Sequence, residues 1–300
     1  MLDISTIILT YNEELHIERC VRNALKFSKN VFIVDSFSTD NTKQIAEHLG
    51  AKVIQNKWEN NHARQFNYGL KNLPIDTKWV FRLDADEYLS DALIAEMHEK
   101  LPKLSIDVTG VVMERKMIFL GRQINKGNVK WNMLRLFQFN KGECEDRWMD
   151  EHIVLKEGRS ILFDNCFYDD NQNSLGWWIQ KHDNYSIREA IELLNVDIDI
   201  LPEASSNISG AMSEDAAEKR KKKEKYNRMP LFWRSFYYFI YRYFFKLGFI
   251  EGKEGFLWHF FQGWWYRTLV DAKIFEIKKN CGTDKTKIID YLNKKYHIYI

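Results

Sequence analysis

The chain has 300 residues, of which 45% are hydrophobic and 29% are charged. This composition allows one large globular domain, or a domain with an appendage. The net charge is only +2, so charge gives no reason to expect a nucleic-acid partner, and we predict none. The four cysteines form no C-x-x-C pair, which favours reduced thiols without structural zinc. The N-terminal stretch MLDISTIILTYNEE predicts a first strand and not a signal peptide.

Short apolar stretches alternate with helical patterns along the first hundred residues. We predict strands at 4–9, 31–34, 51–54 and 79–83. We predict helices at 14–27, from a capped start at 39–42 to Gly50, and at 61–70. This alternation predicts an α/β fold with a mostly parallel central sheet and right-handed crossovers.

Polar residues follow three of these strands directly. They are Thr10–Glu13 after the first strand, Asp35–Asp40 after the second and Asp84–Asp86 after the fourth. Ligands bind at the carboxyl ends of the strands in such sheets. The sequence therefore predicts a binding site at this edge.

Asp84 and Asp86 are separated by one residue at the end of an apolar strand. Two carboxylates at this spacing can direct oxygens at one Mg²⁺ or Mn²⁺ ion. A solvated turn that caps the next helix is the alternative. The chain has neither G-x-G-x-x-G nor G-x-x-x-x-G-K-[ST], so phosphates would have to be held by a metal and basic side chains.

Four segments together resemble the inverting nucleotide-sugar glycosyltransferases of family 2, which have the GT-A fold. They are IILTYNEE at 7–14, VDSFSTDNT at 34–42, NHARQFNYG at 61–69 and LDADE at 83–87, the last matching the family's DXD motif. The resemblance covers about the first 100 residues. It implies a UDP-sugar donor and a Mn²⁺ or Mg²⁺ cofactor.

Two later segments narrow the resemblance. WMDEHIVL at 148–155 and the aromatic stretch 228–258 resemble the branch of lipopolysaccharide-core β-1,4-glucosyltransferases. That branch has a V-H-E segment late in the catalytic domain, where this chain reads Met-Asp-Glu-His. Glu151 is therefore the candidate general base, and Asp150 is the alternative. Adjacent residues of a strand point to opposite faces, so only one of the two can face the cleft.

The resemblance also assigns the nucleotide pocket. Asp35 would contact the uracil or the ribose, and Thr10, Asn12 and Glu13 would line the same pocket. Arg64 would reach toward the nucleotide or the diphosphate. The alternatives are strand-end capping for Asp35 and a solvated helix face for Arg64.

The same resemblance implies a separate role for each residue of the acidic motif. Asp86 would ligate the cation that binds the diphosphate, and Asp84 would hold the ribose or a metal-bound water. Glu87 would support the site or cap a helix. Lys181 and His182 could contact a phosphate, but neither receives a role.

The C-terminal part is rich in aromatic residues. We divide the chain into a GT-A catalytic domain (1–202), a polar basic linker (203–230) and an amphipathic helical region (231–300). On a helical wheel, one face of this region carries Arg234, Arg242 and Lys246. The opposite face carries Phe232, Trp233, Phe236, Ile240, Tyr243, Phe244 and Leu247. This pattern predicts a helix at an anionic membrane surface; packing on the protein's own core is the alternative.

These observations favour an inverting, metal-dependent glycosyltransferase. The acceptor would be a lipid-linked glycan or a lipopolysaccharide core. The enzyme would be cytoplasmic and peripherally attached to the inner face of the cell membrane. A sugar nucleotidyltransferase on a related fold is the alternative, although TYNEELHIER lacks the Gly- and Arg-rich loop of that class. A membrane-surface scaffold with a decayed site is a third hypothesis, which the intact DXD motif and Asp35 disfavour.

Overall fold

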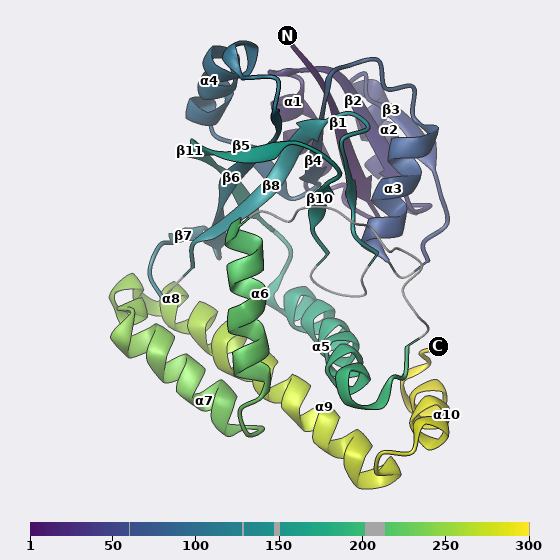
Figure 1. Cartoon of the computed structure of the whole chain (residues 1–300), viewed down its shortest axis with the longest axis vertical. Coiled ribbons are helices and arrows are strands. Elements are labelled where there is room, and N and C mark those ends of the chain that lie inside the picture. The colour runs from purple at the N-terminus through teal and green to yellow at the C-terminus, as the bar shows by residue number, and fades with distance from the viewer. Residues whose placement is uncertain (60, 128, 147–150, 202–213, 300) are drawn as a thin grey trace.

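The computed structural model describes residues 1–59, 61–127, 129–146, 151–201 and 214–299. Figure 1 shows a sheet with flanking helices in the upper half of the molecule and a group of helices below it. The long helix α5 (Leu175–Ile198) leads from the sheet into the lower half. The two halves of the chain thus form two regions that are stacked along the longest axis.

The strands of the main sheet are β1 (Leu2–Thr10), β2 (Ser28–Asp35), β3 (Lys52–Gln55), β4 (Trp79–Asp84), β5 (Glu87–Leu89), β6 (Val108–Phe119), β7 (Arg122–Ile124), β8 (Trp131–Gln138) and β11 (Arg159–Asp170). Strands β9 (Gly142–Cys144) and β10 (Ile153–Leu155) form a separate antiparallel pair. The helices around the sheet are α1 (Ile17–Ala24), α2 (Thr42–His48), α3 (His62–Asn72) and α4 (Asp91–Lys100). Every strand and helix predicted in the first hundred residues is present.

The sheet is parallel in its first half and mixed in its second. Its order is β3-β2-β1-β4-β8-β6-β11-β5, with β7 paired to β6. Strand β1 pairs in parallel with β2 and β4, and β2 pairs in parallel with β3. Strand β8 runs antiparallel to both of its neighbours, β4 and β6. The predicted α/β architecture with a mostly parallel core is confirmed.

Helices cover both faces of the parallel half of the sheet, which is why β1, β2 and β4 are buried along most of their length. Side chains alternate between the faces along β1. Ile4 and Ile8 pack in the core that includes α1, α2 and α4, whereas Ile7 packs in the core that includes Phe66 of α3. The start of α2 is capped as predicted, because the Asp40 carboxylate accepts a hydrogen bond from the backbone N–H of Thr42 (3.0 Å).

The lower half is helical. It contains α5, α6 (Glu214–Asn227), α7 (Trp233–Ile240), α8 (Gly252–Trp258), α9 (Tyr266–Cys281) and α10 (Lys285–Tyr296). Two π-helical turns, η2 (Tyr241–Phe245) and η4 (His259–Trp265), and a 3₁₀ turn, η3 (Gly248–Glu251), lie between α7 and α9. Helices α5, α9 and α10 share a core of their own. Helix α6 lies inside the predicted linker, where a run of Ala, Glu, Lys and Arg favours a helix.

A loop after β7 joins the sheet to the lower helices. The backbone N–H groups of Asn125 and Lys126 donate to Glu251 Oε1 at 2.6 and 3.1 Å. Gly127 follows, with φ +83°, and a Cβ at this residue would lie 2.0 Å from Cε1 of His259. His259 is fully buried. Only a glycine therefore allows the loop to approach the helices this closely.

The amphipathic helix predicted after residue 231 forms, but two of the three basic side chains predicted on its exposed face are buried. Arg234 is 3% exposed and Arg242 is 2% exposed, whereas Trp233 is 60% and Phe245 75% exposed. Arg234 Nε donates to Asp271 Oδ1 at 2.8 Å. Internal acceptors thus draw the guanidinium groups inward, and the prediction of an exposed basic face is wrong for these two arginines.

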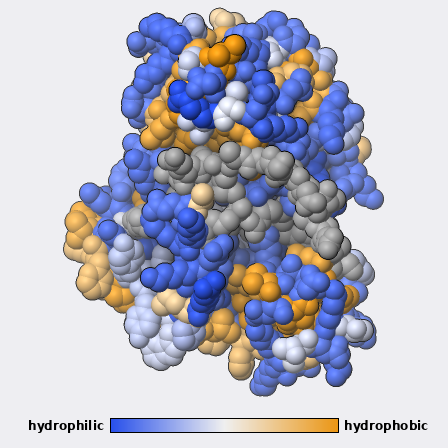
Figure 2. Space-filling model, viewed as in Figure 1, coloured by the Kyte–Doolittle hydropathy of each residue, from blue (hydrophilic) through white to orange (hydrophobic). Residues whose placement is uncertain are grey.

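The side chains that remain outside are largely aromatic. Within the described residues, no helix combines the length and the apolar composition needed to cross a bilayer. We call the exposed group on α7, η2, η3 and α8 the aromatic surface; its members, each at least 41% exposed, are Phe232, Trp233, Tyr237, Tyr241, Phe244, Phe245, Leu247, Phe249, Ile250 and Phe256. Figure 2 shows orange and pale side chains along the edge where α7 and α8 lie, and blue ones over α6.

Candidate functional site

Three strands end level with one another at the carboxyl edge of the sheet. Thr10, the last residue of β1, lies opposite Asp35, the last residue of β2. Asp84, the last residue of β4, lies opposite Leu9 on the other side of β1. Parallel pairing therefore brings the loops after these strands together, as the sequence predicted.

Asp35 is fully buried and accepts hydrogen bonds from several neighbours. Thr10 Oγ1 donates to it at 2.9 Å, the backbone N–H of Ser38 at 2.9 Å and Gln55 Nε2 at 3.2 Å. These contacts fix the direction of the carboxylate. They also show that Asp35 ties together the ends of β1, β2 and β3, which is the structural role considered as the alternative.

Asn12 and Glu13 connect the loop after β1 to the loop after β2. Asn12 has a positive φ of 55°. Its side-chain carbonyl accepts from the N–H of Thr39 at 2.8 Å, and its own N–H donates to Ser38 Oγ at 2.9 Å. The Glu13 carboxylate lies 2.7 Å from Nδ1 of His16. Both predicted residues therefore belong to the same pair of loops as Asp35.

Arg64 lies on the first turn of α3 and is bound to another loop. Its side chain is 50% exposed, and its Nε lies 3.1 Å from Asp146 Oδ2. The next residue, Gln65, turns inward and donates to Ser36 Oγ at 3.0 Å. Gln65, which the sequence analysis did not select, thus reaches the loop that carries Asp35.

Two buried arginines surround the carboxylates at the end of β4. Arg135 of β8 donates to Asp84 Oδ2 at 3.0 Å and to Glu87 Oε1 at 2.6 Å. Arg82 Nε lies 3.9 Å from Asp84 Oδ1. Burial raises the pKa of Asp84, but the Arg135 and Arg82 guanidinium groups outweigh it and hold the pKa well below its usual range. Asp84 is therefore a fixed negative charge.

Glu87 supports the acidic motif by holding the backbone of Asp84, as predicted. Its Oε2 accepts from the backbone N–H of Asp84 at 2.9 Å, and its side chain is 1% exposed. Burial raises the pKa of Glu87 to about 8, with Asp84 and Asp169 acting in the same direction, although the contact with Arg135 opposes the shift.

Asp86 faces a different group of residues. Its Oδ2 accepts from Asn171 Nδ2 at 2.9 Å, and its backbone carbonyl accepts from Arg19 at 3.1 Å. Burial and the charge of Asp86 raise the pKa of Asp169 to about 6, although Arg115 lies 3.3 Å from Asp169. Asp169 is therefore a second carboxylate close enough to Asp86 to be affected by its charge.

The donor set at Asp84 and Asp86 fits a hard cation. Both offer carboxylate oxygens, the ligands that Mg²⁺ and Mn²⁺ prefer. In the part of the chain that the structure describes, no group of three or more His, Cys, Asp or Glu side chains is arranged to hold a metal. Magnesium sites of phosphate-handling enzymes commonly use one or two carboxylates and complete the shell with substrate phosphates and water.

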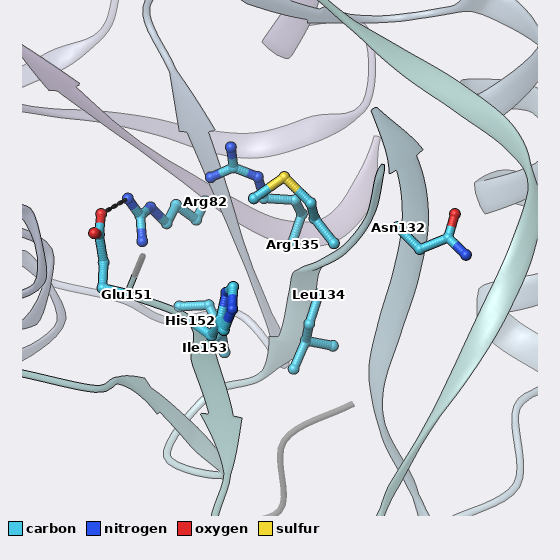
Figure 3. A pocket seen from close by; sticks show the side chains of 8 residues that line it. Arg82, Asn132, Leu134, Arg135, Glu151, His152 and Ile153 are labelled. Carbon is cyan, nitrogen blue, oxygen red and sulfur yellow. Dashed lines mark hydrogen bonds and ion pairs between the residues drawn. The ribbon is translucent and has the colours of Figure 1, made fainter. Parts of the chain in front are cut away.

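Glu151 lies at a small pocket beside this network. Its Oε1 accepts from Arg82 at 3.0 Å, and Figure 3 shows this contact next to His152 and Arg135. The pocket has a volume of about 30 Å³ and is also lined by residues of β8 and β10. This volume suits water or the end of a small group and not a whole nucleotide. Asp150, the alternative base, lies outside the described residues.

Lys181 of α5 approaches the same edge from the helical half. Its Nζ lies 4.6 Å from the centre of the Trp177 ring. Burial lowers the pKa of Lys181, but the charges of Tyr185, Asp86 and Glu13 outweigh it and hold the pKa above its usual range. A permanently charged lysine therefore lies near the predicted nucleotide and metal residues. His182 instead stacks on the ring of Trp178, with the two ring centres 3.5 Å apart. We therefore assign it no phosphate contact.

The arrangement defines an α/β protein with a candidate ligand site at the carboxyl edge of its parallel strands. Residues 5–151 match the family described as Glycosyl transferase family 2. The chain therefore carries a domain of this family, as its four motifs suggested.

The curated relatives are similar to this chain over a limited length. An uncharacterized glycosyltransferase of Rickettsia typhi is 40% identical over 97 residues, which are 32% of this chain and 32% of the relative. The glycosyltransferase SunS of Bacillus phage SPbeta is 29% identical over 108 residues, or 33% of this chain and 24% of the relative. The chain thus aligns with about a third of the length of the first relatives.

One solved structure is similar over most of the fold. The mannosyltransferase PcManGT of Pyrobaculum calidifontis, solved in complex with GDP-Man and Mn²⁺, matches 91% of this chain and 87% of its own chain, with a TM-score of 0.52. The sequences are 14% identical. This likeness establishes the fold, including the helical lower half.

Proposed function

We propose that the protein is an inverting, metal-dependent glycosyltransferase that uses a UDP-sugar donor. The observation that carries this proposal is the meeting of Asp35, Asp84 and Asp86 at one edge of the sheet, next to Glu151. The family 2 domain supports the reaction class. The GDP-Man and Mn²⁺ bound by PcManGT support a nucleotide sugar and a divalent cation.

The loops after β1 and β2 hold the nucleotide in this proposal. Asp35 binds the uracil or the ribose, and Thr10, Asn12 and Glu13 shape the pocket around it. Asp84 holds the ribose end of the donor, and Asp86 holds Mn²⁺ or Mg²⁺. The cation neutralises charge on the departing diphosphate. Arg64 would have to leave Asp146 before it could contact the donor.

Glu151 removes the proton from the acceptor hydroxyl. In a single displacement with inversion, the base lies on the side of the sugar opposite to the leaving diphosphate. Arg82 is a positioning residue, since its hydrogen bond fixes the carboxylate of Glu151 toward the pocket. Asp150 remains the alternative base.

A lipid-linked glycan or a lipopolysaccharide core is the proposed acceptor, at the cytoplasmic face of the cell membrane. The aromatic surface supports this assignment, because exposed Trp, Tyr and Phe side chains suit the boundary between headgroups and acyl chains. The exposed lysines of α6, Lys221, Lys222 and Lys225, add positive charge beside it.

Donor binding tests the proposal directly. We expect UDP to bind tightly only in the presence of Mn²⁺ or Mg²⁺, and we expect Asp86→Ala to remove this dependence. Titration calorimetry with and without Mn²⁺ measures both effects. Asp91→Ala, which removes a carboxylate that is 86% exposed on α4, is the matched control and should behave as the wild type.

Catalysis is tested by incubating the protein with individual UDP- and GDP-sugars and Mn²⁺, without acceptor, and measuring the nucleoside diphosphate released. Slow hydrolysis of one UDP-sugar, lost in Asp86→Ala, supports the proposal. Formation of a nucleotide sugar from UTP and a sugar 1-phosphate would instead assign a nucleotidyltransferase. Equal UDP affinity with and without metal in both proteins contradicts the role of Asp86.

A further inference from the structure

Four helical segments of the lower half bring two arginines and two tyrosines together. Arg242 of η2 has its Cζ 5.3 Å from the centre of the Tyr238 ring, on α7. Arg267 of α9 has its Cζ 4.9 Å from the same ring and 5.0 Å from the ring of Tyr226, on α6. We call these four residues the arginine–tyrosine cluster.

Hydrogen bonding leaves this cluster incomplete. Arg242 is 2% exposed, and its Nε donates to the carbonyl of Gly127 at 2.8 Å. Within the described residues, a terminal nitrogen of Arg242, Nε of Arg267 and the hydroxyl of Tyr226 are buried without a hydrogen-bond partner. Arg242 and Arg267 both donate to the hydroxyl of Tyr238, but each polar atom that stays buried without a partner is costly. A bound group that accepts several hydrogen bonds would remove this cost.

The surrounding charges indicate the sign of that group. A third arginine, Arg234, lies 5.2 Å from the Tyr226 ring, but Asp271 neutralises it. The nearby carboxylate of Glu189 accepts from Tyr266 at 2.6 Å and lies 3.1 Å from Lys223 Nζ. Burial raises the pKa of Tyr238, but Arg242 and Arg267 outweigh it and lower the pKa. Excess positive charge therefore remains, and the missing group is an anion.

Phosphate fits the arrangement better than a carboxylate does. Donors converge from α6, α7, η2 and α9, and a phosphate offers at least three oxygens in different directions, whereas a carboxylate offers two in one plane. Guanidinium groups bind phosphate oxygens in pairs. Tyr226, Tyr238 and Arg267 are partly exposed, so the cluster opens to the surface beside Tyr237 and Tyr241 of the aromatic surface.

We propose that Arg242 and Arg267, with the hydroxyls of Tyr226 and Tyr238, form a phosphate-binding site at the edge of the aromatic surface. The phosphate belongs either to a lipid headgroup or to a soluble phosphate compound. The site is separate from the donor site at the sheet edge, and its existence does not depend on glycosyl transfer.

Two probes of matched surface charge test the site. Phosphatidylcholine vesicles that contain phosphatidic acid present a phosphate monoester, and vesicles that contain oleic acid present a carboxylate. We expect the full-length wild type to prefer phosphatidic acid by roughly tenfold, since the phosphate monoester offers more oxygens to the converging donors than a carboxylate does. Arg267→Gln and Tyr238→Phe should lose this preference, and Lys253→Gln, an exposed change on α8, should keep it.

Calorimetry with inorganic phosphate and pyrophosphate distinguishes the two sources. Competition of these anions with phosphatidic acid vesicles assigns a site for soluble phosphates, and preference for vesicles alone assigns a lipid headgroup. Retained Mn²⁺-dependent UDP binding shows that each variant is folded, and Tyr238→Phe removes a single oxygen atom. Equal binding of wild type to both kinds of vesicle, without binding of soluble phosphate, overturns the proposal. An unchanged preference in both variants also overturns it.

Discussion

Glu151 and Arg82 show how a single ion pair can orient a carboxylate that we propose to be catalytic. Arg82 is 6% exposed and lies between Glu151 and Asp84. It can therefore orient the base and connect it to the acidic motif at the end of β4. Its third partner, Cys144 Sγ at 3.2 Å, anchors the guanidinium group on the opposite side.

We predict that Glu151→Gln lowers kcat by about 10²–10⁴-fold, the usual contribution of a general base. The amide oxygen can still accept from Arg82, so the fold and the UDP affinity should stay near those of the wild type. Steady-state kinetics and UDP titration measure the two effects separately. Glu157→Gln, an exposed carboxylate after β10, is the matched control. Full activity of Glu151→Gln with loss of activity in Asp150→Asn would assign the base to Asp150.

The individual residues differ in how far the sequence could predict them. Asp35, Asp84 and Asp86 follow apolar strands, so their position at the sheet edge was predictable from local pattern. Arg82 and Arg135 lie inside the apolar stretches WVFRLD and WNMLRLFQ. Glu151, Cys144 and Glu87, which they contact, come from other segments that meet them only in the folded protein. A buried arginine in a strand next to an acidic motif is the signal that could have identified them.

At the scale of single elements, Glu96 connects helix α4 to strand β11. It accepts from the backbone N–H groups of Asp164 and Asn165 at 2.8 and 2.9 Å, and Lys100 Nζ lies 2.7 Å away. Burial raises the pKa of Glu96, but these hydrogen bonds outweigh it and lower the pKa to about 2. The ionised form is therefore the one that stabilises this contact.

A carboxylate whose pKa is lower in the folded state than in the unfolded state stabilises the fold at pH values above its unfolded pKa. This stabilisation is lost as the pH falls toward the folded pKa. We predict that Glu96→Gln lowers the free energy of unfolding by about 2–3 kcal/mol at pH 7. The difference from the wild type should shrink below about pH 4.5 and disappear near pH 2. Urea denaturation over this pH range measures it. Glu99→Gln, 71% exposed on the same helix, should have little effect; a constant difference for Glu96→Gln would exclude the linkage.

The elements after residue 231 show where periodicity is insufficient. The helical wheel separated Arg234 and Arg242 correctly from Phe236 and Leu247, but it could not say which face meets the protein. Asp271, 37 residues from Arg234 in the sequence, provides the buried partner that decides it. Local pattern predicts the two faces of a helix, and only tertiary partners decide their direction.

At the scale of the whole molecule, the proposed donor site and the aromatic surface lie in different halves that are joined by a packed contact. Phe119 and Ile124 of the sheet pack with Trp178 of α5 and Trp258 of α8. Lys181, one turn after Trp178, lies near Asp86. An acceptor held at the aromatic surface would therefore meet the sheet edge along α5.

We predict that the protein binds vesicles through aromatic and basic parts that can be separated. Trp233→Ser with Phe245→Ser should weaken binding to neutral and anionic vesicles at any salt concentration. The double variant removes two exposed rings that would become buried at the boundary between headgroups and acyl chains. Replacing Lys221, Lys222, Lys223 and Lys225 with Gln should weaken only the salt-sensitive part, by about 1 kcal/mol per lysine. Co-sedimentation measures both.

The choice of variants matters for this test. Arg234→Glu and Arg242→Glu are unsuitable because both arginines are buried. These changes should unfold the helical half instead of releasing the protein from the vesicles. Lys253→Gln, which removes a single exposed lysine on α8, should bind like the wild type. If the wild type remains in the supernatant with neutral and anionic vesicles alike, the aromatic surface serves another contact.

The junction between the halves also constrains which sequences this fold can tolerate over evolutionary time. Gly127 meets the imidazole of His259 so closely that even a methyl group has no room. Overpacking of this kind commonly costs about 1–3 kcal/mol. Gly127 also has a φ of +83°, a backbone conformation that other residues rarely adopt, so a smaller residue 259 would relieve the clash but not this strain. Mutational drift at the junction is therefore one-sided, because residue 259 can become smaller while residue 127 stays glycine.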